Sequence, residues 1–272
     1  LEGNRLRTLP AGLFQSLSNL EELDLSNNGL EVVEKGAFQG LTKLNEMDLS
    51  DNSLSCLPEG IFREVGMDCP LYWYCYKVTL RLQGNMLRTL DGAFDGFVML
   101  RKLYLQHNRL TSFLPGALKE LKHLSHLDLS NNSLTTLDEH SFDSLEGLQE
   151  LNMAWNQLEA LPPQVFRNLS NLSELHLHGN CLRTLPQNVF HNLSGLWMLD
   201  LCNNGLEVVE KGSFQGLTKL IEMYLSNNTL SILPDGIFIS MNNLRHLDLS
   251  NNSLATLDEH SFDSLEGLQE LN

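Results

Sequence analysis

Residues 20–30 read Leu-Glu-Glu-Leu-Asp-Leu-Ser-Asn-Asn-Gly-Leu, and this frame of L-x-x-L-x-L-x-x-N-x-L recurs along the whole chain. The asparagine of the frame returns every 24 residues, except for one interval of 33 residues and one of 23. These ladder asparagines are Asn4, Asn28, Asn52, Asn85, Asn108, Asn132, Asn156, Asn180, Asn204, Asn228 and Asn252. A fixed period of this length predicts a repeat architecture, in which each repeat packs only against its neighbours.

The residue types of the frame predict which side chains are buried. In L-x-L the two leucines point to one side of a short strand and the residue between them points to the other. The ladder asparagine lies where the chain turns, so its buried amide must bond to backbone groups. A phenylalanine follows most ladder asparagines by ten residues and predicts a second spine on the convex side: Phe14, Phe38, Phe62, Phe142, Phe166, Phe190, Phe214, Phe238 and Phe262. Leu118 takes this place once, and Phe94 comes one residue early.

This frame resembles the 24-residue "typical" subclass of extracellular leucine-rich repeats. That subclass includes the ectodomains of Toll-like receptors, variable lymphocyte receptors, Slit-type proteins and the non-catalytic subunit of carboxypeptidase N. The resemblance implies an α/β fold, a right-handed leucine-rich-repeat solenoid (horseshoe) of about eleven coils with a parallel sheet on its concave face. We expect residues 1–272 to form a single leucine-rich-repeat array.

The composition narrows the classes of partner. The 272 residues include 34 acidic and 18 basic side chains, which gives a formal net charge of -16 at pH 7. An acidic excess without a Lys/Arg-rich run disfavours nucleic acid and anionic membranes as main partners. No run of about 18 apolar residues occurs, so direct membrane insertion is not expected.

Both ends of the chain lie inside the repeat pattern. Arrays of this kind need polar caps over the exposed core. The cysteine-rich caps of the extracellular families are not visible, and the chain stops at Leu271-Asn272 inside a further strand. We therefore interpret residues 1–272 as an uncapped fragment of a longer ectodomain.

The resemblance implies an extracellular location, either secreted or as the ectodomain of a membrane protein. N-x-S/T sequons would then be glycan acceptors. Six occur, at Asn131, Asn168, Asn171, Asn192, Asn227 and Asn251. Because asparagine-rich repeats also make sequons by chance, use of only some of them is expected.

The five cysteines leave at least one without a partner inside the chain. Cys181 and Cys202 stand in columns about 10 Å apart, which exceeds the reach of a disulfide. We interpret them as a surface-turn cysteine and a concave-face thiol. Cys69 and Cys75 could close a small loop, and Cys56 is a competing partner.

The 33-residue interval contains an irregular, aromatic-rich insertion at residues 63–77. It adds nine residues and places Lys77 where the frame expects leucine. One interpretation is a protruding loop that grips a ligand, because long inserts in arrays often bind. The alternative is a lineage-specific bulge or a gene-model artefact.

Parts of the array are near-copies. Residues 126–152 and 246–272 differ only at Thr135 and Ala255, and residues 27–44 and 203–220 differ only at Ala37 and Ser213. Exposed positions match as well, which indicates recent duplication. Ligand-specific chemistry is therefore expected where a coil departs from the copied background.

That background is acidic and hydroxyl-rich at the outward strand positions. It comprises Asp24, Asp48, Asp128, Asp200 and Asp248, then Glu22, Glu46, Glu150, Glu174, Glu222 and Glu270, and Ser26, Ser50, Ser130, Ser226 and Ser250. Neighbouring coils place these acids about 4.8 Å apart, so they repel one another. A solvated acidic face is the simpler interpretation, and attraction of a basic partner is the alternative.

Two groups depart from this background. The basic–aromatic cluster consists of Arg81, Gln83, Arg101, Lys102, Tyr104, Gln106 and His107. The Trp–His cluster consists of Trp155, His176, His178, Trp197 and Met198. Exposed Trp, Tyr and Arg are favoured interface anchors, so we predict that a protein ligand contacts these residues. The alternative is that single apolar residues scatter over any surface.

Two groups of polar residues bear on metal binding and on catalysis. His176 and His178 share one side of a strand with Glu174, and Cys202 occupies the next coil, a set that could hold zinc. Because H-x-H is common in strands, we predict solvated side chains, no metal and no cofactor. Asp138-Glu139-His140-Ser141, which recurs at residues 258–261, does not form a triad, since consecutive side chains diverge. Other catalytic motifs are missing, so an enzyme is not expected.

The sequence therefore predicts an extracellular recognition module that binds a protein or microbial ligand on its concave face. A Toll-like innate immune receptor ectodomain is the first hypothesis, and the resemblance then implies ligand-driven homodimer formation, which the residues themselves leave open. The alternative is a secreted matrix or carrier scaffold that holds a partner protein or enzyme.

Overall fold

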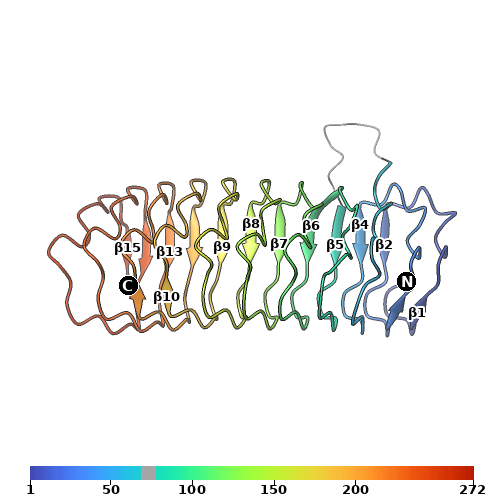
Figure 1. Ribbon diagram of the computed structural model, residues 1–272, viewed down its shortest axis with the longest axis horizontal. Coiled ribbons are helices and arrows are strands. Elements are labelled where there is room, and N and C mark those ends of the chain that lie inside the picture. Colours follow the sequence, from blue (N-terminus) through green and yellow to red (C-terminus); the bar gives the residue numbers. More distant parts are fainter. Residues whose placement is uncertain (69–77) are drawn as a thin grey trace. The chain divides into compact units, whose positions relative to one another are not determined.

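The structure, a computed structural model, describes residues 1–68 and 78–272. It forms two compact units, Leu1–Ser133 (unit 1) and Leu134–Asn272 (unit 2), and each is described by itself. Within each unit the strands lie side by side in sequence order (Figure 1). Of the insertion at 63–77, the part at 69–77, with Cys69 and Cys75, falls outside the described residues.

Unit 1 contains a parallel sheet in the order β2 (Glu22–Asp24), β4 (Glu46–Asp48), β5 (Val78–Arg81), β6 (Leu100–Tyr104) and β7 (His126–Asp128). On the other side of the coils, β1 (Thr8–Leu9) pairs with β3 (Val32–Val33). The predicted parallel sheet is therefore confirmed in this unit.

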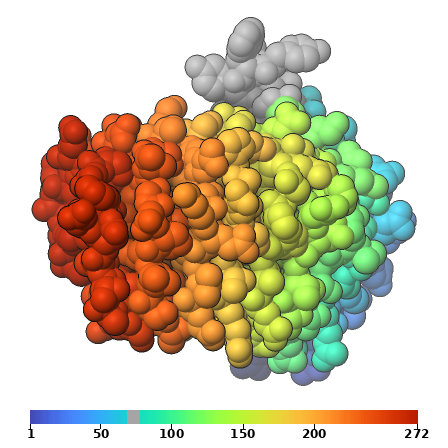
Figure 2. Space-filling view, turned by 60° about the vertical axis from the view of Figure 1, so that its left-hand side comes forward, coloured from blue at the N-terminus to red at the C-terminus, as the bar shows by residue number. Residues whose placement is uncertain are grey.

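Unit 2 repeats the arrangement with β8 (Glu150–Asn152), β9 (Glu174–His176), β11 (Met198–Asp200), β13 (Glu222–Tyr224), β14 (His246–Asp248) and β15 (Glu270–Leu271). A second pair joins β10 (Thr184–Leu185) to β12 (Val208–Val209). This pair matches β1 and β3, because residues 203–220 nearly copy residues 27–44. The coils of unit 2 follow one another from yellow to red (Figure 2).

Among the described residues the segments that join the strands are turns, with no helix, although the α/β class implies helical connections. Close packing between coils explains the difference. Gly40 has a φ of 88°, and a Cβ added to it would lie 2.5 Å from the carbonyl oxygen of Gln15 in the preceding coil. A left-handed glycine at such a close approach breaks a helix, so the connection stays a chain of turns.

The ladder asparagines satisfy the backbone between coils, as the frame predicts. Asn52 accepts the N–H of Leu30 through its Oδ1 (3.0 Å) and donates through its Nδ2 to the carbonyls of Leu25 (3.0 Å) and Leu49 (3.1 Å). Asn180 does the same in unit 2 with Leu158 N–H (3.1 Å) and Met153 O (3.0 Å). Each amide thus fixes its own turn and the coil before it.

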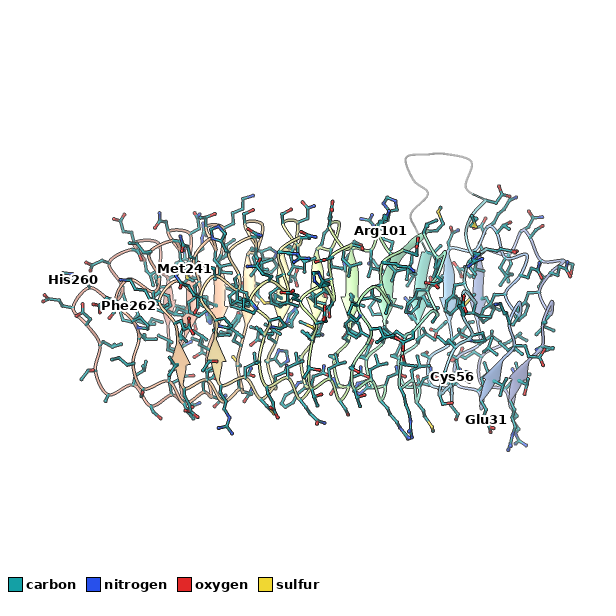
Figure 3. All side chains as sticks on the ribbon, in the orientation of Figure 1. Glu31, Cys56, Arg101, Met241, His260 and Phe262 are labelled. Atoms are coloured by element: carbon teal, nitrogen blue, oxygen red, sulfur yellow. The ribbon has the colours of Figure 1, made fainter. Side chains whose placement is uncertain are left out.

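The phenylalanine spine is confirmed in both units. In unit 1 the rings of Phe38 and Phe62 stack with centroids 5.7 Å apart, and Phe62 also stacks on Phe97 at 5.3 Å. In unit 2 Phe190 stacks on Phe166 at 6.0 Å and on Phe214 at 6.3 Å. These rings are fully buried, and so is the side chain of Met241 (Figure 3). By contrast, the side chains of Cys56 and His260 are exposed at the outside of their units.

The first residues of the predicted insertion can be followed in the structure. Residues 63–68 still follow the coil: Val65 is buried, and the N–H of Gly66 donates to the carbonyl of Leu41 (3.1 Å). Val78, where the described residues resume, is buried. It directly follows position 77, where the frame expects leucine. The pairing of β5 with β6 shifts register between Val78 and Thr79, which absorbs this displacement.

Candidate recognition surface

The outward residues of the strands form what we call the sheet face. Its aspartates are fixed by a local bond: Oδ1 of Asp24 accepts the N–H of Ser26 (2.9 Å), and the same bond occurs at Asp248 with Ser250 (2.9 Å). The Ser26 hydroxyl also donates to Asp24 (2.7 Å) and, with the N–H, lowers the pKa of that carboxyl. These local bonds orient the carboxylates of Asp24 and Asp248, and the lowered pKa keeps Asp24 ionised at neutral pH.

The basic–aromatic cluster interrupts this background in unit 1. Arg81 lies opposite Tyr104 across β5 and β6, with its guanidinium 5.7 Å from the centre of the tyrosine ring. The same guanidinium forms an ion pair with Glu46 on β4. Arg81 is thus held on two sides, which lowers the entropy that it would lose on contact with a ligand.

The remaining members of this cluster spread around that pair. Lys102 lies opposite Thr79, while Arg101 and His107 are exposed (Figure 3 labels Arg101). Oε1 of Gln83 and Oε1 of Gln106 are buried and have no hydrogen-bond partner within the described part of the chain. Each is therefore a buried acceptor whose hydrogen-bonding capacity is unsatisfied.

In the Trp–His cluster of unit 2, Trp155 has an unusual backbone. It lies one residue before its ladder asparagine with a φ of 54°, in the left-handed region. Asn203, Asn227 and Asn251 hold the same turn position with φ of 53°, 53° and 54°, and Gly179 holds it with 68°. Asparagine and glycine tolerate this conformation, whereas a bulky side chain there is an outlier.

The Trp155 ring is placed by its neighbours in the next coil. A Cβ added to Gly179 would lie 2.6 Å from Cδ2 of Trp155, so the indole lies directly against the glycine backbone. The ring also meets His178 edge-on, with centroids 5.9 Å apart. Trp155 is nevertheless 53% exposed, so about half of a large apolar side chain faces solvent.

One of the two histidines of the cluster, His178, contacts a carboxylate on the next coil. Nδ1 of His178 lies 2.9 Å from Oδ2 of Asp200, at ion-pair distance although the ring is not aligned for a hydrogen bond. Burial alone would raise the pKa of Asp200, but the His178 ring and the backbone N–H of Cys202 outweigh it and lower that pKa. The carboxylate is therefore ionised at neutral pH.

Cys202 does not contact these histidines through a bond. Its Sγ lies 3.0 Å from the Ser226 hydroxyl, and burial raises the pKa of the thiol to about 11. Cys181 is exposed, and both cysteines are free, so the prediction that they do not pair is confirmed. Cys56 is likewise a free thiol.

Trp197 and Met198 occupy a different part of the sheet face from Trp155. Met198 lies between Glu174 and Glu222 on the neighbouring strands. Trp197 lines a hollow of about 450 Å³ together with Gly195, Lys219, Ile221, Asn243 and Arg245. The structure therefore brings Trp155 and the two histidines together but separates them from Trp197.

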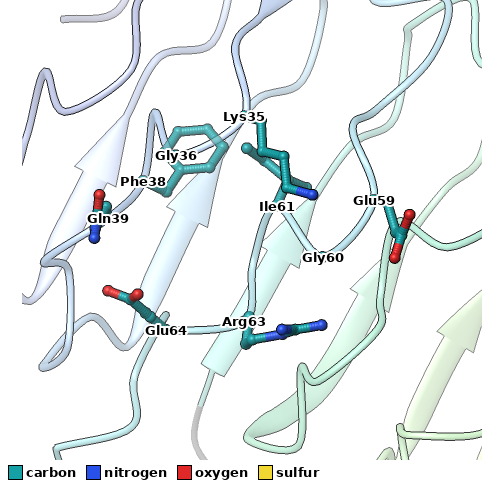
Figure 4. Close-up of a pocket in the computed structure, with 9 residues that line it drawn as sticks. All are labelled: Lys35, Gly36, Phe38, Gln39, Glu59, Gly60, Ile61, Arg63 and Glu64. Atoms are coloured by element: carbon teal, nitrogen blue, oxygen red, sulfur yellow. The ribbon is translucent and has the colours of Figure 1, made fainter.

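Other hollows lie between the turn segments. One of about 230 Å³ in unit 1 is lined by Lys35, Phe38, Glu59, Arg63 and Glu64 among others (Figure 4). A hollow of about 320 Å³ recurs between turn segments in unit 2, lined by Phe166, Arg167 and their neighbours. None of the residues in the two predicted clusters lines either hollow.

Comparison with known proteins decides the family. The family model described as "Leucine rich repeat" matches residues 1–63, 99–158, 154–206, 196–236 and 231–272. The chain belongs to the leucine-rich repeat family. The predicted solenoid fold and the resemblance to extracellular leucine-rich repeats are thereby confirmed.

Relatives match this leucine-rich repeat chain over short stretches. Lumican of Bos taurus is 48% identical over 61 residues, which is 22% of this chain and 18% of lumican. Lumican of Mus musculus is 46% identical over 59 residues, 21% of this chain and 17% of lumican. The matched stretch is thus less than a fifth of these relatives.

Solved structures match over nearly the whole chain. TLR13, solved in complex with ssRNA13, is 29% identical with a TM-score of 0.80, covering 94% of this chain and 40% of TLR13. Drosophila Toll, solved in complex with Spatzle, is 26% identical with a TM-score of 0.73, covering 93% and 37%. FLRT2, solved in an octameric complex with Latrophilin 3 and Unc5D, is 26% identical with a TM-score of 0.82, covering 98% and 77%.

The leucine-rich repeats also reveal residues that the sequence prediction missed. Ile221 and Arg245 stand in the same column as Trp197, seven residues before their ladder asparagines, and line the same hollow. The shared column is the sequence signal for this trio, because each member replaces the background residue at the same position of its coil. No helix within residues 1–68 and 78–272 is long and apolar enough to cross a bilayer.

The six sequons fall into two structural groups. Asn131, Asn227 and Asn251 lie exposed in left-handed turns at the rim of the sheet face. The amides of the other three donate to carbonyls of the preceding coil, at 2.8–2.9 Å, and comprise Asn168, Asn171 and Asn192. Asn171 and Asn192 are exposed as well and Asn168 is half-buried, so the groups differ mainly in whether the amide bonds to the preceding coil.

Proposed function

We propose that this chain is an extracellular recognition module of the leucine-rich repeat family that binds a protein ligand on its sheet face. Trp155 is the main anchor in unit 2, with His176 and His178 beside it. Arg81 and Tyr104 provide the corresponding contact in unit 1. The remaining predicted residues, including Lys102, His107 and Met198, form the border of these contacts.

The backbone of Trp155 carries this proposal. A left-handed conformation costs a residue with a bulky side chain about 1–2 kcal/mol, and its half-exposed ring recovers only part of the burial available to an indole. Most other coils place asparagine or glycine there, and Asp51 and His107 are the exceptions. Strain retained at an exposed aromatic residue supports a binding role, because binding would bury the remaining ring surface.

Charge favours a protein over a nucleic acid as the ligand. TLR13 was solved with ssRNA13, but the sheet face here carries aspartates at Asp24, Asp48, Asp128, Asp200 and Asp248, and the chain has a net charge of -16. A phosphate backbone would meet like charge, whereas a basic or mixed protein surface would not. Toll with Spatzle and FLRT2 with Latrophilin 3 and Unc5D are examples of protein complexes in this family.

Within this proposal the chain acts in innate immune recognition, as a Toll-like receptor ectodomain does, and has no catalytic activity of its own. Glycans on Asn131, Asn227 and Asn251 would border the sheet face and restrict the direction from which a ligand approaches. Homodimer formation driven by the ligand is the arrangement that this function implies.

The experiment is a binding screen with the secreted chain against a panel of extracellular proteins, followed by surface plasmon resonance with each binder. Trp155→Asn is the decisive variant, because asparagine suits the left-handed backbone and removes only the indole. We expect it to weaken binding at least tenfold, and Trp155→Ala combined with Tyr104→Ala to abolish binding. Ile239→Asn, at a turn residue that is 73% exposed, is the matched control.

The same variants separate recognition from the scaffold alternative. A scaffold that holds its partner through the turn segments keeps that partner in Trp155→Asn and loses it in changes such as Ile239→Asn. Unchanged affinity of every binder for Trp155→Asn would contradict the sheet-face proposal.

A further inference from the structure

We propose that His176, His178 and Asp200 form a binding site for a divalent transition metal, with Zn²⁺ as the best-matched ion. Their ligand atoms all lie within 4.8 Å of one another. The inference goes beyond the proposed function, because it concerns affinity for an ion whether or not a protein ligand is bound. It also departs from the prediction that these side chains are merely solvated.

Strand register brings the three side chains together. His176 on β9 lies directly opposite Asp200 on β11 in the parallel pairing. His178 follows His176 by two residues and so points to the same side, where its Nδ1 lies 2.9 Å from Oδ2 of Asp200. The ligands thus form a triangle across two neighbouring coils, on secondary structure that the ladder asparagines hold in place.

The carboxylate is already oriented for a metal. Oδ1 of Asp200 accepts the N–H of Cys202 (3.0 Å), the local bond that the aspartates of other coils make, and this leaves Oδ2 toward the histidines. Such hydrogen bonds to a ligating carboxylate fix its direction and are a usual part of metal sites. In the background coils, serine and aspartate stand where His178 and His176 stand here.

The environment favours a cation with nitrogen and oxygen ligands. The side chains of His176, His178 and Asp200 are only 20%, 25% and 21% exposed, which strengthens electrostatic attraction relative to open solvent. Glu174 Oε2 lies 3.7 Å from His176 Nε2 and adds a second carboxylate nearby. Cys202 is not a ligand, because its sulfur contacts the Ser226 hydroxyl.

The chemistry of the set matches zinc. Zn²⁺ takes imidazole nitrogens and carboxylate oxygens at about 2.0–2.2 Å in a tetrahedral arrangement, which places ligand atoms about 3.4 Å apart. The present spacing needs shifts of about 1 Å, which small rotations of the partly exposed imidazoles supply. Three protein ligands leave the fourth position to water or to a donor from a bound partner.

The test is isothermal titration of Zn²⁺ into the full chain after treatment with EDTA. Accessible thiols are alkylated first, so that Cys56 and Cys181 do not compete. We expect one ion per chain, at least tenfold weaker binding in Asp200→Asn and at least hundredfold weaker binding in His176→Gln combined with His178→Gln. Glutamine keeps the size and polarity of the position, and the folding of each variant is checked by circular dichroism.

The matched control is His246→Gln combined with His260→Gln. These histidines also contact acids, Glu270 at 2.9 Å and Asp263 at 2.8 Å, but belong to neither three-ligand group found among the described residues. The control variant should keep wild-type affinity. Equal affinity of the wild type and the His176/His178 variant would overturn the proposal, as would the lack of a saturable site in the wild type.

A second measurement applies if the double variant does not fold. Co²⁺ bound to the wild-type chain should show visible d–d absorption without a sulfur-to-cobalt charge-transfer band. A thiolate band, or no d–d absorption at all, would overturn the assignment to two histidines and an aspartate.

Discussion

At the residue scale, the turn position before each ladder asparagine has the same backbone conformation in every coil but not the same residue type. The residue before each ladder asparagine adopts a left-handed backbone, for example Asn203 (φ 53°) and Gly179 (φ 68°). Trp155 and His107 occupy the same position with φ of 54° and 57°. Asparagine or glycine suits the turn there, whereas tryptophan adopts it at the expense of backbone strain, and we propose that this strain serves ligand contact.

The strain at Trp155 can be measured without a ligand. We expect Trp155→Gly to be more stable than Trp155→Ala by about 1 kcal/mol in urea unfolding, because both lose the indole and only glycine relaxes at positive φ. Trp197, whose backbone is not left-handed, is the control. There alanine should be the more stable by about 0.5–1 kcal/mol, and the same order at both sites would contradict the account.

A second residue-scale prediction concerns pH. Burial alone would raise the pKa of Asp143, but its contacts with His140 and Arg167 outweigh that effect and lower it. Glu139 also faces His140, at 3.3 Å. A lowered folded-state pKa stabilises the protein above the unfolded-state value of about 3.9, and this contribution disappears as pH falls through the folded-state value.

We therefore expect Asp143→Asn to lower the free energy of unfolding at pH 7 by about 0.2–1 kcal/mol, with the gap closing below about pH 4. Asp263→Asn in the near-copy is the control. Asp263 also contacts its histidine, His260, at 2.8 Å, but its side chain is 67% exposed, so its loss should be smaller. A gap for Asp143→Asn that widens in acid would refute the assignment.

At the element scale, columns of equivalent buried residues hold each coil to its neighbours. The repeat frame predicts these columns well. The ladder asparagines and the phenylalanine spine both recur in each unit, because one buried position per coil must match its neighbour. The turn connections were less predictable, since glycine contacts between coils, as at Gly40, decide them. The shifted register at Val78 also depends on the preceding insertion rather than on the frame.

The spine supports a prediction about cooperativity. Phe190→Ala should lower the free energy of unfolding by about 3–5 kcal/mol, because the ring is fully buried between Phe166 and Phe214. Phe190→Leu should cost less, since Leu118 fills the same place in unit 1. Hydrogen exchange should quicken most in the adjacent coils, and a uniform change throughout unit 2 would contradict nearest-neighbour packing.

At the scale of the whole molecule, family and fold follow from the sequence, but the arrangement of the candidate surface does not. The frame alone identified the leucine-rich repeat and both outward clusters. It did not show that Trp155 meets His178, that Trp197 lies apart with Ile221 and Arg245, or that Asp200 contacts His178. These contacts depend on side-chain directions across neighbouring coils, which a count of positions does not provide.

The central claim is that ligand contact occurs on the sheet face, and hydroxyl-radical footprinting of a ligand complex tests it most directly. Oxidation is measured by mass spectrometry at residues of both surfaces, with and without the ligand. The account predicts protection of Trp155 and Met198 on the sheet face, with little change at His260 and Ile239, which are exposed on the turns. Protection of His260 or Ile239 with unchanged oxidation of Trp155 would contradict it.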